Sequence, residues 1–223
     1  MPTIALLQQL PTPFMATFVL VHLTAPAVAS LGGSSMSSQV MLLGREYYQG
    51  SWGETALVWA PFGIHVAASL VKRIAVRPRP FKLSVLTATA YPLLLLAPLH
   101  ILTHRVYPSS SIPSISSLGP GELDYEFVKV GLETWPWRGW ILYGGLVGCV
   151  ALHSVEGIRV VWKAWGAGEP GLLKGWGRWI AAGGAFALVL AGVGNIAAEP
   201  LYVPSFLLSR IKSSYAQSWA YRV

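Results

Sequence analysis

Four histidines lie within long apolar segments of the sequence, where an imidazole without a partner costs free energy. They are His22, His65, His100 and His153. At the rise of an α-helix, His65 lies ~10 Å from the cation at which its segment ends, Lys72. His153 lies ~9 Å from Arg159, which ends its own segment. Two imidazoles at one depth on different helices can ligate a haem iron from both faces, so His65 and His153 are candidate metal ligands.

Residues around this pair could complete a haem site. Gly157 lies one turn after His153 and could leave room for the edge of the macrocycle. Arg159 or Lys72 could neutralise the haem propionates. The second interpretation of such histidines is structural, since a ring in a membrane bundle can bridge helices through hydrogen bonds to Thr, Ser or backbone groups.

The other histidines are expected at different depths. His22 lies ~13 Å from Pro13 at helical rise, and we expect it near the level of the first pair. His100 and His104 are expected nearer the opposite side of the membrane.

Other site chemistries find less support. Zinc needs nitrogen, sulfur or carboxylate ligands at short spacing, and no carboxylate or cysteine accompanies these histidines with that spacing. No nucleophile-elbow or phosphate-binding glycine pattern is present. The single Cys149 excludes an intramolecular disulfide and any CxxC motif. The sequence also lacks a flavin or iron–sulfur module, so we expect a protein that is not an enzyme.

The histidine-bearing segments are long and apolar enough to cross a membrane. The chain has 223 residues, of which 53% are hydrophobic and 11% charged, about half the charge usual for a soluble domain. A crossing takes ~20 apolar residues. Five windows qualify: 13–31, 55–71, 83–103, 139–162 and 179–198. The sequence therefore predicts an all-α membrane protein with five transmembrane helices and no soluble catalytic domain.

Basic residues predict the orientation of this bundle. Nine of the sixteen follow the second window or surround the link between the fourth and fifth: Lys72, Arg73, Arg77, Arg79, Lys82, Arg159, Lys163, Lys174 and Arg178. By the positive-inside rule this face and the N-terminus lie in the cytosol, and the C-terminus lies across the membrane. A basic face also suits anionic lipid headgroups. Without a nucleic-acid motif, we expect no nucleic-acid partner.

A weak internal repeat relates the first four windows. The first and third carry their histidines in similar settings, Val21-His22-Leu23 and Leu99-His100-Ile101. The second and fourth each carry a histidine followed by an exit cation, and an aromatic, acidic segment lies within each half. We expect two halves related by an axis along the membrane normal, with the fifth helix as an addition.

Three segments are expected outside the membrane helices. Residues 1–12 would form a short cytosolic N-terminus, where Pro11 and Pro13 either set the entry of the first helix or form an extended recognition segment. Residues 32–53 begin as a Ser-rich loop. The tail 199–223 mixes apolar and basic residues and is expected to form an interfacial amphipathic helix.

One short run resembles a known haem protein. The run His153-Ser154-Val155-Glu156-Gly157-Ile158-Arg159 is similar to the His-x-x-x-Gly-Ile-Arg segment of the cytochrome b membrane subunit of succinate dehydrogenase. In that family the histidine is a haem b ligand, which implies haem b as the cofactor. The resemblance puts His65 in the place of the partner histidine from the second membrane anchor.

The bundle as a whole resembles the fungal mitochondrial contact-site adaptor family, whose transmembrane domain is a cytochrome b-like bundle. The shared features are the five spans, the duplicated half, and the runs Gly44-Arg45-Glu46-Tyr47-Tyr48-Gln49 and Leu99-His100-Ile101-Leu102-Thr103-His104-Arg105. The resemblance implies residence in the mitochondrial outer membrane, with the C-terminus in the intermembrane space. It also implies recruitment of a bridge-like lipid-transfer protein through a Pro-x-Pro motif, for which Pro11 and Pro13 are the candidates.

The leading hypothesis is a non-enzymatic outer-membrane adaptor that supports contact sites and lipid homeostasis. Haem b would be bound by His65 and His153, with His22 and His100 as further candidates for cofactor binding. One alternative is a b-type cytochrome anchor that passes electrons to quinone. A second is a lipid scramblase or transporter, suggested by the prolines and polar groups in the first three helices.

Overall fold

The computed structural model describes residues 2–75 and 83–222, so the predicted cytosolic cations Arg77, Arg79 and Lys82 lie outside the described residues. These ranges contain helices and no strand. The α-helices are α1 Pro2–Gln9, α2 Thr12–Ala27, α3 Ala29–Tyr48, α4 Ala60–Ala75, α5 Val85–Ile101, α6 Tyr125–Thr134, α7 Pro136–Ala164, α8 Gly177–Ala198 and α9 Ser205–Tyr215. The π-helices are η1 Glu54–Trp59 and η2 Leu102–Val106, and the short 3-10 turns are η3 Tyr107–Ser109, η4 Pro120–Glu122 and η5 Gly171–Leu173.

Five helical runs are long and apolar enough to cross a membrane, which confirms the predicted number. They are span I Thr3–Ala27, span II Glu54–Ala75, span III Val85–Ser109, span IV Pro136–Ala164 and span V Gly177–Ala198. Large apolar side chains on these spans remain exposed in the protein, among them Leu20 at 71% and Ile180 at 72%. Membrane lipid is the expected neighbour of such a surface.

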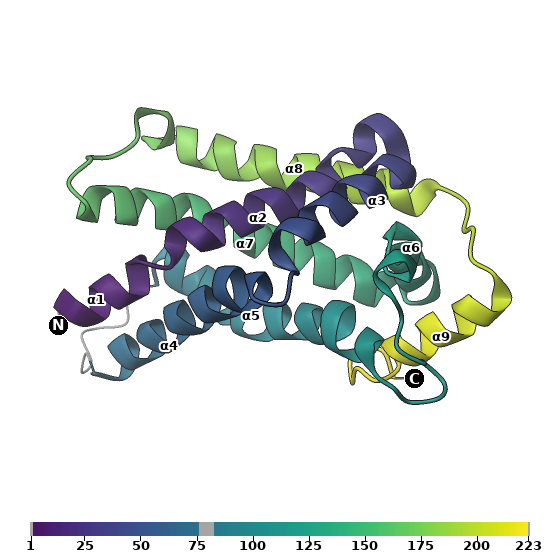
Figure 1. Cartoon of the computed structure of the whole chain (residues 1–223). Coiled ribbons are helices and arrows are strands. Elements are labelled where there is room, and N and C mark those ends of the chain that lie inside the picture. The colour runs from purple at the N-terminus through teal and green to yellow at the C-terminus, as the bar shows by residue number, and fades with distance from the viewer. Residues whose placement is uncertain (1, 76–82, 223) are drawn as a thin grey trace.

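Span I begins ten residues before the predicted window, which corrects the expectation that 1–12 lies outside the bundle. Pro11 keeps helical backbone angles, φ −72° and ψ −15°. The N–H of Leu10 bonds to the Leu6 carbonyl, and the N–H of Met15 bonds to the Pro11 carbonyl. The prolines therefore kink span I between α1 and α2 instead of starting it (Figure 1). The extended recognition segment considered for Pro11 and Pro13 is wrong for the same reason.

The spans form an arc in which close backbone packing joins neighbours. Span II packs chiefly on span I through α1 and α4, and span I packs on span V through α2 and α8. Span V packs on span IV, and span IV packs on span III through α7 and α5 (Figure 1). Along the arc the spans follow the order II, I, V, IV, III, so span II and span IV are not neighbours in it. Histidine side chains make contact between these two spans.

The expected Ser-rich loop over 32–53 is mostly the helix α3. Its backbone leaves helical geometry at Gly33, with φ +62° and ψ −161°, a region open essentially to glycine alone. There the Ser34 N–H donates to the Glu199 carboxylate over 2.9 Å, and the Ser34 hydroxyl donates to its other oxygen. The Ser34 hydroxyl is the main group that holds the pKa of Glu199 below its usual range. An acid that follows α8 thus satisfies backbone at the kink in α3, a contact that local propensity does not indicate.

The C-terminal tail packs on protein more than expected for an interfacial helix. Ile211 and Tyr215 of α9 are fully buried, and the Tyr215 ring stacks on Phe127 of α6 at 4.6 Å. Arg210 contacts the Glu122 carboxylate over 2.5 Å. The hydrogen bond from the Gly119 N–H contributes most to lowering the pKa of Glu122, and the bond from Arg210 lowers it further. The tail therefore closes one end of the bundle.

Candidate functional site

His65 and His153 face each other between span II and span IV, as the sequence predicts. His65 lies in α4 and His153 in α7. Their ring centroids are 6.2 Å apart and their planes are nearly perpendicular, at 88°. Both side chains are partly buried. The ring contact therefore agrees with the expectation that the two histidines lie at the same level.

The tautomer of His65 is set by the backbone of α1. Its Nδ1 lies 2.8 Å from the Gln8 carbonyl oxygen, which can only accept, so Nδ1 carries the proton. The lone pair of the ring is then on Nε2. The Gln8 side chain continues this contact, since it donates to the Ser69 hydroxyl and accepts from the Lys72 ammonium group.

The tautomer of His153 is set by a threonine on span III. Its Nδ1 lies 3.2 Å from the Thr89 hydroxyl oxygen. That hydroxyl lies 2.8 Å from the Val85 carbonyl and 3.3 Å from the Leu86 carbonyl. With its single proton donated to one of them, the oxygen accepts from His153. His153 therefore also has its lone pair on Nε2. Metal-ligating histidines in proteins usually donate their other ring N–H in this way.

His22, His100 and His104 form a second group of rings. The centroids of His22 and His100 are 5.9 Å apart with planes at 80°, and those of His100 and His104 are 4.5 Å apart. The expectation that His22 shares the level of His65 is wrong, because span I begins before Pro13 and His22 lies deeper in the bundle. The placement of His100 beside His104 agrees with the sequence.

Two of these three rings have polar partners. His22 Nδ1 lies 3.5 Å from the Tyr48 hydroxyl, and His104 Nε2 lies 3.2 Å from the Tyr143 hydroxyl. His100 Nδ1 is buried and has no hydrogen-bond partner within residues 2–75 and 83–222. An unsatisfied buried nitrogen of this kind calls for an explanation.

The residues expected to support a haem have different environments. A side chain placed at Gly157 would meet no atom within 4 Å, which leaves space one turn from His153. Arg159, in contrast, contacts the carboxylates of Glu156, at 2.7 Å, and of Glu169. The role of Arg159 as a partner for propionates is therefore not favoured, because two acids already neutralise it.

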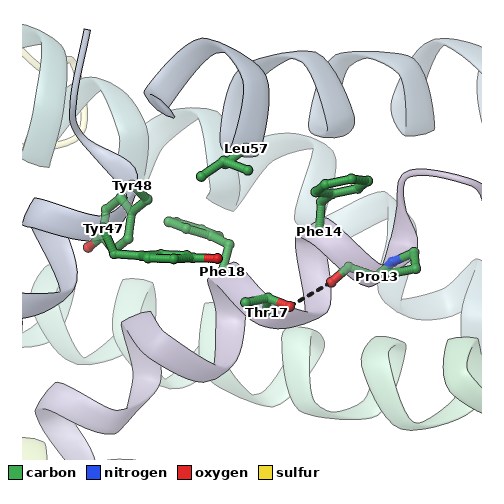
Figure 2. Close-up of a pocket in the computed structure, with 7 residues that line it drawn as sticks. All are labelled: Pro13, Phe14, Thr17, Phe18, Tyr47, Tyr48 and Leu57. Atoms are coloured by element: carbon green, nitrogen blue, oxygen red, sulfur yellow. Dashed lines mark hydrogen bonds between the residues drawn. The ribbon is translucent and has the colours of Figure 1, made fainter. Parts of the chain in front are cut away.

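The two prolines of the N-terminal motif lie in different settings. Pro11 is buried at the junction of α1 and α2, whereas Pro13 is exposed. Pro13 lines a cavity of about 200 Å³. Figure 2 shows the other residues around it: Phe14, Thr17, Phe18, Tyr47, Tyr48 and Leu57. The Phe18 ring also stacks on His22, with centroids 5.4 Å apart, so the cavity adjoins the second histidine group.

Sequence reasoning missed the groups that orient the rings. The sequence places Gln8 in a segment expected outside the bundle, and no sequence pattern distinguishes Thr89 from the other threonines. The available signal was the cost of a lone imidazole in a membrane, which requires some donor or acceptor nearby. It could not indicate which helix supplies the partner.

Two facing pairs of imidazoles are available as ligands: His65 with His153, and His22 with His100. Within residues 2–75 and 83–222, no group of three or more His, Cys, Asp or Glu side chains is arranged to hold a metal ion. A haem iron needs only two axial ligands from the protein, since the macrocycle supplies the other four. A scan of family models and searches of curated proteins and of solved structures found no match to this chain.

Proposed function

We propose that this chain is a multi-pass mitochondrial outer-membrane protein that holds haem b between His65 and His153. We further propose that it acts as an adaptor at organelle contacts in support of lipid homeostasis. The observation that carries the haem proposal is the facing of these two imidazoles, each with its Nδ1 proton committed to a neighbouring helix. The adaptor proposal rests on the resemblance of the sequence over the bundle.

The separation of the rings fits an iron between them. A metal–imidazole bond of about 2 Å on each side, plus about 1 Å from each nitrogen to its ring centre, separates two axial rings by ~6 Å. The observed separation of the centroids is 6.2 Å. The hydrogen bonds of His65 to the Gln8 carbonyl and of His153 to Thr89 are also those of rings that bridge helices. What favours an iron is that the two rings face each other at this separation.

The chain's residues would have distinct tasks around the cofactor. Bound haem would supply a reversible one-electron change at iron. His65 and His153 would ligate it, while the Gln8 carbonyl and the Thr89 hydroxyl keep the rings in position. The open space at Gly157 would accommodate the edge of the macrocycle.

The haem proposal is tested with the full-length chain purified in detergent and titrated with haemin. We expect a low-spin b-type difference spectrum between the reduced and oxidised protein. The double variant His65→Ala, His153→Ala should lose the part of this spectrum that comes from haem bound by the pair. A wild-type chain that binds no haem in the titration would overturn the proposal, and a spectrum unchanged in the double variant would assign it to other histidines.

The adaptor proposal gives the two prolines unequal weight. Pro13 is exposed on span I, and Pro11 is buried in helical backbone. A partner that reads this segment would therefore contact Pro13 directly and reach Pro11 only if the junction of α1 and α2 opened. In co-purification with a bridge-like lipid-transfer protein, we expect Pro13→Ala to weaken binding by the full-length chain. Failure of the wild-type chain to retain that partner would contradict the proposal.

The cavity of Figure 2 favours one second candidate function, electron transfer to quinone. Its walls are mostly aromatic, and Tyr48 and Thr17 add hydroxyl groups at its edge. A planar ring with two carbonyl groups suits such walls, and Phe18 connects the cavity to His22. If quinone binds here, a quinone analogue should shift the haem spectrum of the wild-type chain, and Phe18→Ala should reduce the shift. An analogue without effect on the haem-loaded wild type would exclude this function.

A further inference from the structure

The His22 and His100 pair repeats the geometry of His65 and His153. The centroids of the first pair are 5.9 Å apart with planes at 80°, against 6.2 Å and 88° in the second. Both separations agree with the ~6 Å expected for two axial imidazoles on one iron. One pair joins span I to span III, and the other joins span II to span IV.

The internal repeat accounts for this likeness. It relates the first window to the third and the second to the fourth, so each pair consists of two residues that the repeat makes equivalent. A two-fold axis along the membrane normal brings equivalent residues face to face across the axis. Both pairs have this arrangement. Four histidines brought together by chance would not be expected to pair in this symmetric way.

The two pairs lie at different depths. Thr89 contacts His153 and so marks the level of the first pair on α5. His100 follows Thr89 by eleven residues on the same helix, which corresponds to ~16 Å along the axis. A haem at one pair would therefore leave room along the axis for another at the second pair.

We propose that His22 and His100 are the axial ligands of a second haem, nearer the side of the membrane that holds the C-terminal tail. The inference rests on the proposed haem-binding function. His22 would be oriented by the Tyr48 hydroxyl and by the ring of Phe18. Phe18 and Tyr48, which contact His22, also line the cavity of about 200 Å³ (Figure 2).

The environment of His100 supports ligation over a purely structural role. Its Nδ1 is buried without a partner among the described residues, and a buried polar atom left unsatisfied costs free energy. A bond from this nitrogen to iron would give it a partner. His104 is the neighbouring alternative, but its Nε2 already faces the Tyr143 hydroxyl at 3.2 Å. His104 therefore serves as a matched control.

The test is the ratio of haem to protein in the full-length chain after haemin titration. Haem is measured as its pyridine complex, and protein by amino-acid analysis. We expect two haems per wild-type chain and one in the double variant His22→Ala, His100→Ala. We also expect one in His65→Ala, His153→Ala and two in His104→Phe. The near-perpendicular rings should give both haems strongly anisotropic low-spin signals in electron paramagnetic resonance.

The outcomes separate this inference from the function on which it rests. One haem per wild-type chain, retained in His22→Ala, His100→Ala and lost in His65→Ala, His153→Ala, overturns the second site alone. No haem in the wild type overturns both. Loss of one haem in His104→Phe would replace His100 by His104 as the ligand.

A conservative variant guards against loss of haem through misfolding. His100→Met keeps a ligand for iron, and exchange of one imidazole for a thioether raises the reduction potential of the haem. We expect this variant to keep two haems, with one potential raised and the other unchanged. Two unchanged potentials would show that His100 does not ligate iron.

Discussion

Thr89 offers a direct test of how His153 is held. Its side chain is only 6% exposed, and its hydroxyl accepts from His153 Nδ1 over 3.2 Å. In Thr89→Val the side chain keeps its shape but cannot accept, so His153 loses this hydrogen bond and retains the one to the Leu86 backbone. Removing such a partner of a metal ligand typically weakens affinity about 10- to 100-fold.

Two independent magnitudes for Thr89→Val agree. A 10- to 100-fold loss of haem affinity corresponds to about 1.4–2.8 kcal/mol. Leaving a buried donor unsatisfied costs about 1–3 kcal/mol. We therefore expect the Kd for haem at the His65 and His153 pair to rise by about tenfold, the lower end of this range, because the Leu86 backbone still contacts the ring.

The assay is haemin titration of purified Thr89→Val, with Thr89→Ser as the matched control because serine retains the hydroxyl. The serine variant should bind with a Kd within about threefold of the wild-type value, far less than the loss expected for an unpaired ligand. Equal affinity in wild type and Thr89→Val, together with haem loss in His153→Ala, would refute the role given to the threonine. Weakening in Thr89→Ser without weakening in Thr89→Val would instead assign the effect to the lost methyl group.

Further variants test the room in the bundle and the closure of its end. Gly157→Leu should lower haem affinity without lowering the thermal stability of the haem-free chain, because its side chain would enter open space. Gly192→Ala should destabilise the chain by about 1–3 kcal/mol, because its Cβ would lie 1.8 Å from the Pro26 carbonyl oxygen of α2. Gly184→Ala is the control, because its Cβ would meet no atom within 4 Å. Thermal unfolding of the two variants measures the difference. Protease cleavage before α9 should increase in acid. The pKa of Glu122 is lowered in the folded chain, so its ion pair with Arg210 stabilises the fold fully above the ordinary pKa of 4.5. This stabilisation is lost as the pH falls through the lower pKa of the folded chain. Glu122→Gln should remove this pH dependence.

The five spans could be predicted because length and hydropathy alone define a membrane crossing. The start of span I could not, since the sequence rule that proline ends a helix competes with packing of α1 against α4. Pro11 stays helical because α1 packs against α4 on one side of the kink and α2 packs against α3 and α8 on the other. The same mistake shifted the expected depth of His22. His65 and His153 were counted from Lys72 and Arg159, which both lie toward the ends of their spans.

The partners across helices were beyond reach of the sequence. Ser34 begins a helical run because Glu199, far along the chain, accepts its N–H. Thr89 orients His153 because α5 lies beside α7. Such contacts depend on the arrangement of the spans, which periodicity within one helix does not specify.

The most direct test of the central claim is to locate iron in the haem-loaded protein by anomalous X-ray scattering from crystals of the full-length chain. We expect an iron peak between Nε2 of His65 and Nε2 of His153, about 2 Å from each. Iron bound away from this pair, with the two rings still in contact, would contradict the account.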